Sequence, residues 1–317
     1  CGKSSRATAQ PRAMPGRYLF DVSESLGGRF WSLADTDENS VRQLSLSLGT
    51  PDFISRLLSL RGVNAEAAPG FLSPKLRDSF PDPSAFQDME KAAGLVLDAI
   101  AEGRKVTVFA DYDVDGGTSS ALLARYFRAW GRDLGLYVPD RLTEGYGPSP
   151  AAFRYLKEQG ADLVVTVDCG AAATEALEEA GRIGLPVIVI DHHTQTRDLP
   201  PAHSIVNPNR RDCDYPFKGL AGVGVSFKVV QALSEAFMDG GERRGYLNSL
   251  LDLVALGTVA DVASVLDENR VLVRHGLKAM TRTKRAGLRS LKQMARCDDG
   301  PIDTTAIGFR LGPRLNS

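Results

Sequence analysis

Three aspartates spaced two residues apart, Asp111, Asp113 and Asp115, form the most informative stretch of the sequence. Carboxylates crowded this closely repel each other and raise each other's pKa unless a cation neutralises them. Ligation by oxygen alone suits Mg²⁺ or Mn²⁺. The stretch continues into Gly116-Gly117-Thr118-Ser119-Ser120, whose N–H groups at the start of a helix can bind an anion. The pattern therefore predicts a divalent-metal site that faces a phosphate.

Two other interpretations fit part of this stretch. An Asp-x-Asp-x-Asp-Gly run also begins a calcium-binding EF-hand loop, but that loop needs a glutamate at its twelfth position. Counting from Asp111, this position is Leu122, and the helix-loop-helix flanks are missing. The second interpretation is a solvated acidic turn with capping residues, which the run alone leaves open.

The same context, an apolar strand-like stretch that ends in a polar side chain, recurs further along the chain. LVVTVDCG leads to Asp168, and VIVIDHH leads to Asp191, His192 and His193. ALGTVAD ends in Asp261 on a segment that has helical character. The recurrence argues against an isolated acidic turn.

The carboxyl ends of neighbouring parallel strands lie side by side at one edge of a sheet. We therefore expect the following side chains to converge: Asp113, Asp115, Asp168 and His192. Carboxylates that converge with an imidazole predict a two-metal site, with Asp168 as the bridging ligand. Two divalent ions about 3.5–4 Å apart can activate a water molecule for attack on a phosphodiester.

A sheet is needed to hold these side chains, and the sequence predicts one. Apolar, β-branched stretches predict strands over 106–110, 134–138, 163–167 and 187–190, alternating with helical runs such as Ser119 to Trp130. Alternating strands and helices over residues 86–235 are typical of an α/β fold with a doubly wound, mainly parallel sheet flanked by helices. Residues 245–296 are expected to be helical and to carry Asp261 back to the site.

The N-terminal part of the chain has a different composition. Residues 1–85 are punctuated by proline and glycine, with short helical stretches such as Pro51 to Arg61, and predict a small, partly helical extension. Residues 86–317 are expected to form the catalytic domain. With 317 residues and 43% hydrophobic content, the chain can bury a substantial core in two domains.

Beyond the Asp-His-His triplet, four longer stretches carry a resemblance to a known family. They are RLTEGYG (141–147), IVNPNRRDCDYPFKGLAGVGVSFK (205–228), DLVALGTVADVASVLDENRVLVRHGL (252–277) and GPRLNS (312–317). In order and spacing they resemble the DHH phosphoesterase superfamily and, within it, the RecJ family of single-stranded-DNA exonucleases. The resemblance covers nearly the whole chain.

The resemblance implies roles for individual residues. It implies metal ligation by Asp113, Asp115, Asp168, His192 and Asp261, with Asp111 as an additional or supporting ligand. His193 would face the scissile phosphate instead of binding metal. Contacts to phosphate or nucleic acid are expected from His193, Arg141, Tyr146, Arg314 and Asn316.

The activity that the resemblance implies is metal-dependent 5′-to-3′ hydrolysis of single-stranded DNA to 5′-mononucleotides in DNA recombination and repair. Two ions, Mn²⁺ or Mg²⁺, would serve as cofactors. A single-strand-binding protein and a helicase are expected partners, and the enzyme is expected to be a monomer. The alternatives are a DHH phosphodiesterase acting on short oligonucleotides or cyclic dinucleotides, and a non-catalytic nucleic-acid-binding protein on the same fold.

The local distribution of charge says more about nucleic-acid binding than the net charge does. The net charge of −1 and the pI near 6.5 leave no overall basic footprint for nucleic acid. The segment from Thr281 to Arg296 carries six basic residues and no acid, so it can either track a phosphate backbone or form a solvated helix face. Arg210, Arg211 and Lys218 are further candidates for holding a single strand.

Cysteine usage points to a reducing compartment. Cys1, Cys169, Cys213 and Cys297 form no CxxC pair, and Cys169 beside Asp168 is expected to be a buried, inert thiol. No apolar run is long enough to span a membrane and no secretory signal is present, so a cytoplasmic location is expected. The chain begins without Met and stops inside the GPRLNS motif, which suggests the N-terminal catalytic fragment of a longer protein.

Overall fold

The computed structural model describes residues 25–29, 31–32, 34–76, 81–195 and 198–316. The chain divides into two compact units, Cys1–Lys75 and Leu76–Ser317. In the first unit, helices α1 (Glu38–Leu48), α2 (Asp52–Leu60) and α3 (Ala68–Leu72) pack around a small core of Leu44, Leu58 and Ala68. The N-cap Asp37 accepts hydrogen bonds from two main-chain N–H groups of α1, and Gly49 in the left-handed region ends it.

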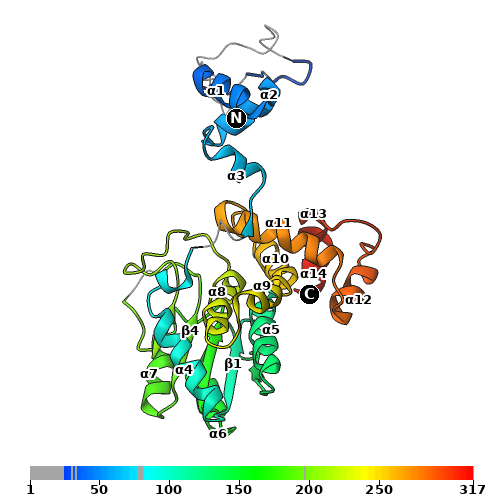
Figure 1. The fold of residues 1–317 in the computed structure, drawn as a ribbon. Coiled ribbons are helices and arrows are strands. Elements are labelled where there is room, and N and C mark those ends of the chain that lie inside the picture. Colours follow the sequence, from blue (N-terminus) through cyan, green and yellow to red (C-terminus); the bar gives the residue numbers. More distant parts are fainter. Residues whose placement is uncertain (1–24, 30, 33, 77–80, 196–197, 317) are drawn as a thin grey trace, which may run out of the picture. The chain divides into compact units, whose positions relative to one another are not determined.

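The second unit is built on a five-stranded parallel sheet of order β2-β1-β3-β4-β5 (Figure 1). The strands are β1 (Val106–Ala110), β2 (Gly135–Tyr137), β3 (Leu163–Val167), β4 (Val187–Ile190) and β5 (Ser204–Val206). In register, Ala110 pairs with Val167, and Val167 pairs with Ile190. The last residues of β1, β3 and β4 therefore lie side by side at one edge of the sheet.

Helices cover both faces of this sheet. One face packs against α4 (Met89–Ala101), α5 (Val114–Ala129) and α8 (Gly222–Glu235), and the other packs against α6 (Pro150–Glu158) and α7 (Thr174–Arg182). Successive strand residues alternate between the two cores: Val108 points into the first and Phe109 into the second. Because both faces are covered, every residue of β1, β3, β4 and β5 is buried.

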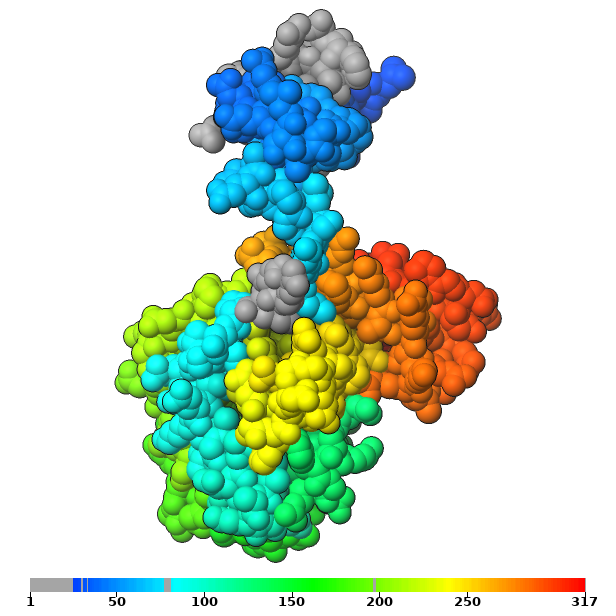
Figure 2. All heavy atoms as spheres, viewed as in Figure 1, coloured from blue at the N-terminus to red at the C-terminus, as the bar shows by residue number. Residues whose placement is uncertain are grey.

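A helical layer follows the sheet in sequence and extends the first core. It consists of α9 (Gly240–Asn248), α10 (Leu251–Ala260), α11 (Asp267–Thr281), α12 (Ala286–Met294), α13 (Thr304–Ala306), the π-helical turn Ile307–Leu311 and α14 (Gly312–Leu315). Helix α10 packs against α5, α8 and α11, and Figure 2 shows this yellow and orange layer packed on the green α5. A short 3₁₀ turn, Pro83–Ala85, precedes α4.

The α/β fold class, the four expected strands and the helical character of residues 245–296 are confirmed. One strand was missed, and the start of one helix was wrong. β5 was not expected as a strand, because its three residues are too few to show an alternating pattern. Helix α5 begins at Val114 instead of Ser119, so Asp115 lies in the first turn of the helix and not on the turn before it.

Two further findings concern the apolar character of the helices and the state of the cysteines. Among the described residues, no helix combines the length and the apolar character that crossing a bilayer would require. Cys169, Cys213 and Cys297 are buried free thiols. Burial raises the pKa of Cys169 well above its usual value, which disfavours a reactive thiolate there.

Candidate metal centre

The ends of three neighbouring strands bring acidic side chains to one edge of the sheet. Asp111 follows β1, Asp168 follows β3 and Asp191 follows β4, and all three are buried. Two residues beyond Asp111, Asp113 caps α5 by accepting hydrogen bonds from the N–H groups of Asp115 and Gly116, at 2.8 and 3.0 Å. Strand register and helix capping therefore position the carboxylates before any ion binds.

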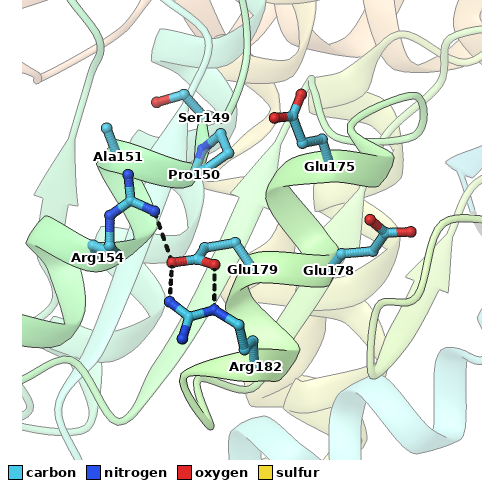
Figure 3. A pocket seen from close by; sticks show the side chains of 8 residues that line it. All are labelled: Ser149, Pro150, Ala151, Arg154, Glu175, Glu178, Glu179 and Arg182. Carbon is cyan, nitrogen blue, oxygen red and sulfur yellow. Dashed lines mark hydrogen bonds and ion pairs between the residues drawn. The ribbon is translucent and has the colours of Figure 1, made fainter.

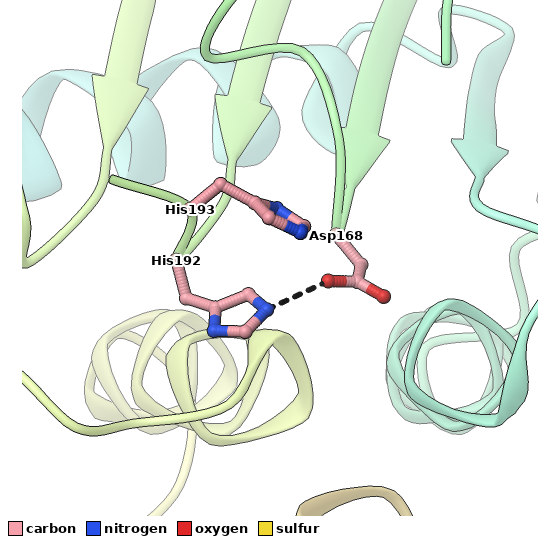
Figure 4. Close-up of side chains that lie close together, drawn as sticks. All are labelled: Asp168, His192 and His193. Carbon is pink, nitrogen blue, oxygen red and sulfur yellow. Dashed lines mark ion pairs between the residues drawn. The ribbon is translucent and has the colours of Figure 1, made fainter. Parts of the chain in front are cut away.

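Three overlapping groups of side chains have the spacing of metal ligands, with one ligand atom of each residue within 4.8 Å of the others. These groups are Asp111, Asp113 and Asp168; Asp115, His192 and Asp261; and Asp168, His192 and His193. Figure 4 shows the last group, with the His192 ring directed toward the Asp168 carboxylate. All six residues expected to bind metal thus lie in groups that share members.

Asp115 is fully buried, and its carboxylate is oriented by a second helix. Its two oxygens accept hydrogen bonds from the N–H groups of Gly222 and Val223, at 2.6 and 2.8 Å, at the start of α8. The N-terminus of a helix favours a negative charge at this position. The sequence had suggested that the N–H groups from Gly116 to Ser120 can bind an anion, but that of Gly116 is engaged by the capping side chain of Asp113. The expectation was wrong for this one group.

Burial and mutual repulsion govern the protonation of this cluster. Burial, followed by the charge of Asp113, raises the pKa of Asp168 to about 9. Burial and the neighbouring Asp168 raise the pKa of Asp115 well above its usual value. Burial also raises the pKa of Asp261, and that of Asp111 to about 6. Without a cation, Asp168 therefore holds its proton at neutral pH.

Two glycines leave the space that the carboxylates occupy. A Cβ atom at Gly222 would lie 2.9 Å from Oδ1 of Asp168 and 3.0 Å from Oδ2 of Asp115. A Cβ atom at Gly257 would lie 2.3 Å from Oγ1 of Thr118 and 3.0 Å from Oδ1 of Asp115. Backbone and carboxylate can approach this closely only because both positions lack a side chain.

The donor set fits a divalent cation. Nε2 of His192 lies 3.1 Å from Oδ1 of Asp168, yet both atoms are buried without a hydrogen-bond partner among the described residues. Buried polar atoms of this kind are costly unless something satisfies them. A cation coordinated by both atoms would do so, and a set of carboxylates with one imidazole suits Mn²⁺ or Mg²⁺.

The second histidine is held differently from the first. Nδ1 of His193 lies 2.7 Å from Oδ1 of Asp191, and this hydrogen bond raises the pKa of His193. Burial alone would raise the pKa of Asp191, but its hydrogen bonds with His193 and with the N–H groups of Ala171 and His193 outweigh burial and lower that pKa. Asp191 also accepts the N–H of His192 at 2.7 Å. The sequence placed Asp191 at the strand end without giving it this supporting role.

An aromatic and cationic surface borders the histidines. The Tyr146 hydroxyl lies 3.4 Å from Nε2 of His193 and 3.4 Å from the Asp168 carbonyl oxygen. Tyr112 packs edge-on against Tyr146, and the guanidinium of Arg141 lies over the Tyr112 ring at 5.2 Å. Tyr112 was not singled out from the sequence, although its position between two metal-ligand candidates was a usable signal.

A pocket of about 300 Å³ opens beside this surface and is lined by Tyr146, Gly147, Pro148, Gly170, Ala172, Ala173, Asp191 and His193. The pocket therefore adjoins His193, the histidine that is hydrogen-bonded to Asp191. A second hollow of about 570 Å³ lies between α6 and α7, and none of the candidate metal ligands lines it. Figure 3 shows Glu179 there, engaged by both Arg154 and Arg182, so neither guanidinium is left unpaired for an anion.

The two candidates from the C-terminal motif have different surroundings. Asn316 accepts the N–H of Val114 on its side-chain oxygen at 3.0 Å, which joins α14 to the start of α5. Arg314 is exposed and donates a hydrogen bond to the Arg310 carbonyl oxygen. Asn316 therefore contacts the segment that carries Asp113 and Asp115.

Several basic residues that the sequence suggested for strand binding are used inside the protein. Arg210 is buried and forms ion pairs with Asp88 and Asp212, each at 2.7 Å. In the segment from Thr281 to Arg296, Arg285 pairs with Asp252, and Lys292 is buried with its amine on two main-chain carbonyl groups. These contacts count against Arg210, Arg285 and Lys292 as candidates for strand binding, because acids and main-chain carbonyl groups of the protein already engage them.

The chain is similar in sequence to known proteins. Residues 105–258 match the family model described as "DHH family, N-terminal domain". The chain is 39% identical to the single-stranded-DNA-specific exonuclease RecJ of Bacillus subtilis over 288 residues, which are 90% of this chain and 35% of that protein. It is 39% identical to the Escherichia coli RecJ over 275 residues, which are 84% of this chain and 47% of that protein.

Solved structures agree with the sequence relatives. The crystal structure of RecJ in complex with Mn²⁺ from Thermus thermophilus superposes with a TM-score of 0.72 at 30% identity, over 89% of this chain and 39% of that one. The crystal structure of an exonuclease RecJ bound to manganese gives a TM-score of 0.65 at 34% identity. The match covers 73% of this chain and 57% of that one. This chain therefore spans between about a third and about a half of the length of these curated relatives.

Proposed function

Because this chain belongs to the DHH family and is similar to RecJ nucleases over most of its length, we propose that it hydrolyses phosphodiester bonds of single-stranded DNA with Mn²⁺ or Mg²⁺. Hydrolysis proceeds from the 5′ end and releases 5′-mononucleotides, in DNA recombination and repair. The observation that carries this proposal is the convergence of five buried or half-buried carboxylates with two histidines at one edge of the sheet.

Asp113, Asp115, Asp168, His192 and Asp261 are the metal ligands in this proposal, and Asp111 is an additional one. Bound metal would lower the pKa of a water molecule and stabilise charge on the phosphate oxygens. The protein's own contribution is to hold the ligands in place before metal arrives. Asp113 does so as the cap of α5, and Asp115 does so through the two N–H donors of α8.

His193 acts on the phosphate. Its Nδ1 is engaged by Asp191, and its Nε2 has only the long contact of 3.4 Å with the Tyr146 hydroxyl, which a phosphoryl oxygen would replace. The raised pKa favours the protonated ring, which donates a hydrogen bond to a phosphoryl oxygen where negative charge accumulates. Asp191 keeps the ring in this orientation and stabilises its positive charge.

The strand is held by side chains around the pocket. Tyr146 stacks on a base or sugar of the terminal nucleotide, and Arg141 pairs with a phosphate. Arg314 and Asn316 contact phosphate near α5. The side-chain oxygen of Asn316 already accepts the Val114 N–H, so its amide nitrogen is the group that can reach a phosphate oxygen.

We place the enzyme in the cytoplasm as a monomer that works with a single-strand-binding protein and a helicase. The support for these partners is the similarity to RecJ proteins. The residues themselves favour catalysis over a purely binding role, because each position expected to ligate metal carries a carboxylate or an imidazole.

The test is a nuclease assay with Mn²⁺ on a long, 5′-labelled single strand beside a labelled dinucleotide, using the parent and Asp168→Ala. We expect mononucleotides from the long strand with the parent and none with the variant. Cleavage of the dinucleotide alone would move the assignment to the small-substrate enzymes of the family. Metal-dependent DNA binding without cleavage would indicate a non-catalytic protein, and equal cleavage by the variant would exclude both enzymatic functions.

A further inference from the structure

One buried amide connects two loops of the metal centre. Asn269 is completely buried in the first turn of α11. Its Nδ2 donates one hydrogen bond to the carbonyl oxygen of Gly219 at 2.6 Å and another to that of Ser264 at 3.0 Å. The two acceptors are 45 residues apart in the chain, and both donor hydrogens of this amide are used.

The first acceptor belongs to the segment that leads into α8. Three residues after Gly219, the N–H groups of Gly222 and Val223 orient the Asp115 carboxylate. The residue before Asn269, Glu268, binds the same segment by accepting the Tyr215 hydroxyl at 2.6 Å. The start of α11 thus holds residues 215–219 at two points, immediately before the donors that Asp115 needs.

The second acceptor belongs to the loop that follows Asp261. This loop joins α10 to α11, and it is bounded by two residues in the left-handed region, Val262 with φ of 60° and Asp267 with φ of 39°. Such a conformation is costly for residues with a Cβ atom, above all for a β-branched valine, and persists only where the surroundings enforce it. The hydrogen bond to Ser264 anchors the middle of the loop.

We propose that Asn269 is a positioning residue of the metal centre, which sets the distance between Asp115 and Asp261 by holding both of their supporting loops. Asp115, His192 and Asp261 have ligand atoms within 4.8 Å of one another, so a shift of either loop changes this set directly. The inference rests on the proposed function only in taking Asp115 and Asp261 as metal ligands.

The experiment measures Mn²⁺ binding by electron paramagnetic resonance, without substrate, in the parent and in Asn269→Leu. Leucine has a similar volume and no donor. Tyr126→Phe is the matched control, because it removes another buried hydrogen bond to a main-chain carbonyl, from Tyr126 to Leu233 at 3.0 Å. Thermal unfolding of the metal-free proteins reports the loss of stability in each variant.

We expect Asn269→Leu to weaken Mn²⁺ binding by about 10- to 100-fold, the range typical for residues that support metal ligands. Tyr126→Phe should lower the melting temperature and leave Mn²⁺ affinity unchanged. If Asn269→Leu does not fold, Asn269→Ala replaces it, since the smaller side chain leaves room for water to bind the two carbonyls.

The possible negative results overturn different statements. Parent-like Mn²⁺ affinity in a folded Asn269 variant, or an equal loss in Tyr126→Phe, would overturn the positioning role and leave the proposed function intact. A parent protein that binds no Mn²⁺ would overturn the proposed function and this inference with it.

Discussion

Nδ1 of His193 lies 2.7 Å from Oδ1 of Asp191, and both residues belong to the turn that follows β4. The same carboxylate oxygen accepts the main-chain N–H groups of His192 and His193. Asp191 therefore organises the turn that presents one histidine to the metal ligands and the other to the pocket.

Replacing this carboxylate should change the pH dependence of the reaction. In Asp191→Asn the hydrogen bond that raises the pKa of His193 loses its charge, so the ring loses its proton at a lower pH. We expect activity at alkaline pH to fall and the descending limb of the profile to move to lower pH, because a smaller fraction of the His193 ring is protonated there. The kcat profile between pH 5 and 9 checks this, and an unshifted limb would contradict the role of protonated His193.

Gly222→Ala should damage the metal centre through sterics alone. The added Cβ atom would lie 2.9 Å from Oδ1 of Asp168, closer than real Cβ contacts allow, so the carboxylate or the start of α8 must move. We expect Mn²⁺ affinity and kcat to fall by about 10- to 100-fold. Calorimetric titration with Mn²⁺ measures the change in affinity.

The control for this change is Gly94→Ala in the middle of α4, where an added Cβ atom meets nothing within 4 Å. It should stabilise the helix by up to about 1 kcal/mol and leave metal binding unaltered. Equal metal affinity in Gly222→Ala and the parent would show that the close approach of Gly222 to the Asp168 carboxylate is not needed for metal binding.

The metal-free protein should lose stability as the pH rises. Asp168, with its pKa at about 9, and Asp111, at about 6, hold protons in the folded state that the unfolded chain has already released above its ordinary pKa near 4. Where the folded state binds more protons, the free energy of unfolding decreases with pH, here through the window from about 4 to 9.

Mn²⁺ should reverse this trend, because it binds the ionised carboxylates. We expect the melting temperature in a chelator to be lower at pH 8.5 than at pH 6, and the increase on adding Mn²⁺ to be larger at pH 8.5. Differential scanning calorimetry at both pH values makes the measurement. A metal-free melting temperature that rises between pH 6 and 8.5 would argue against the protonated cluster.

Val262→Gly should stabilise the fold. Val262 has a φ of 60° and a side chain that is 86% exposed, so its removal relieves backbone strain and loses little burial. The relief of about 1–2 kcal/mol or more exceeds the entropic cost of glycine, about 0.5–1 kcal/mol, so the free energy of unfolding should rise by about 1 kcal/mol. Chemical denaturation measures the change.

Val265→Gly in the same loop is the comparison, because Val265 is not in the left-handed region and is only 40% exposed. It should lower the free energy of unfolding. If both variants lowered it equally, Val262 would not be strained.

The sequence was sufficient for four of the five strands and for most of the candidate metal ligands. A buried parallel strand is a short apolar run, and the residue after it lies at the ligand-binding edge, so Asp111, Asp168 and His192 were placed by local pattern alone. The chemistry of a carboxylate is a property of the residue, and crowded carboxylates indicate a cation whatever surrounds them.

Only the tertiary structure decided which groups support that chemistry and which do not. Asp115 is oriented by the start of α8, 107 residues further along the chain, and Arg210 pairs with Asp88, 122 residues before it, as well as with the nearby Asp212. Asn269 binds two loops whose proximity no local pattern encodes. These partners depend on how helices pack across the domain, and packing between distant segments leaves no periodicity or spacing that can be read from one sequence.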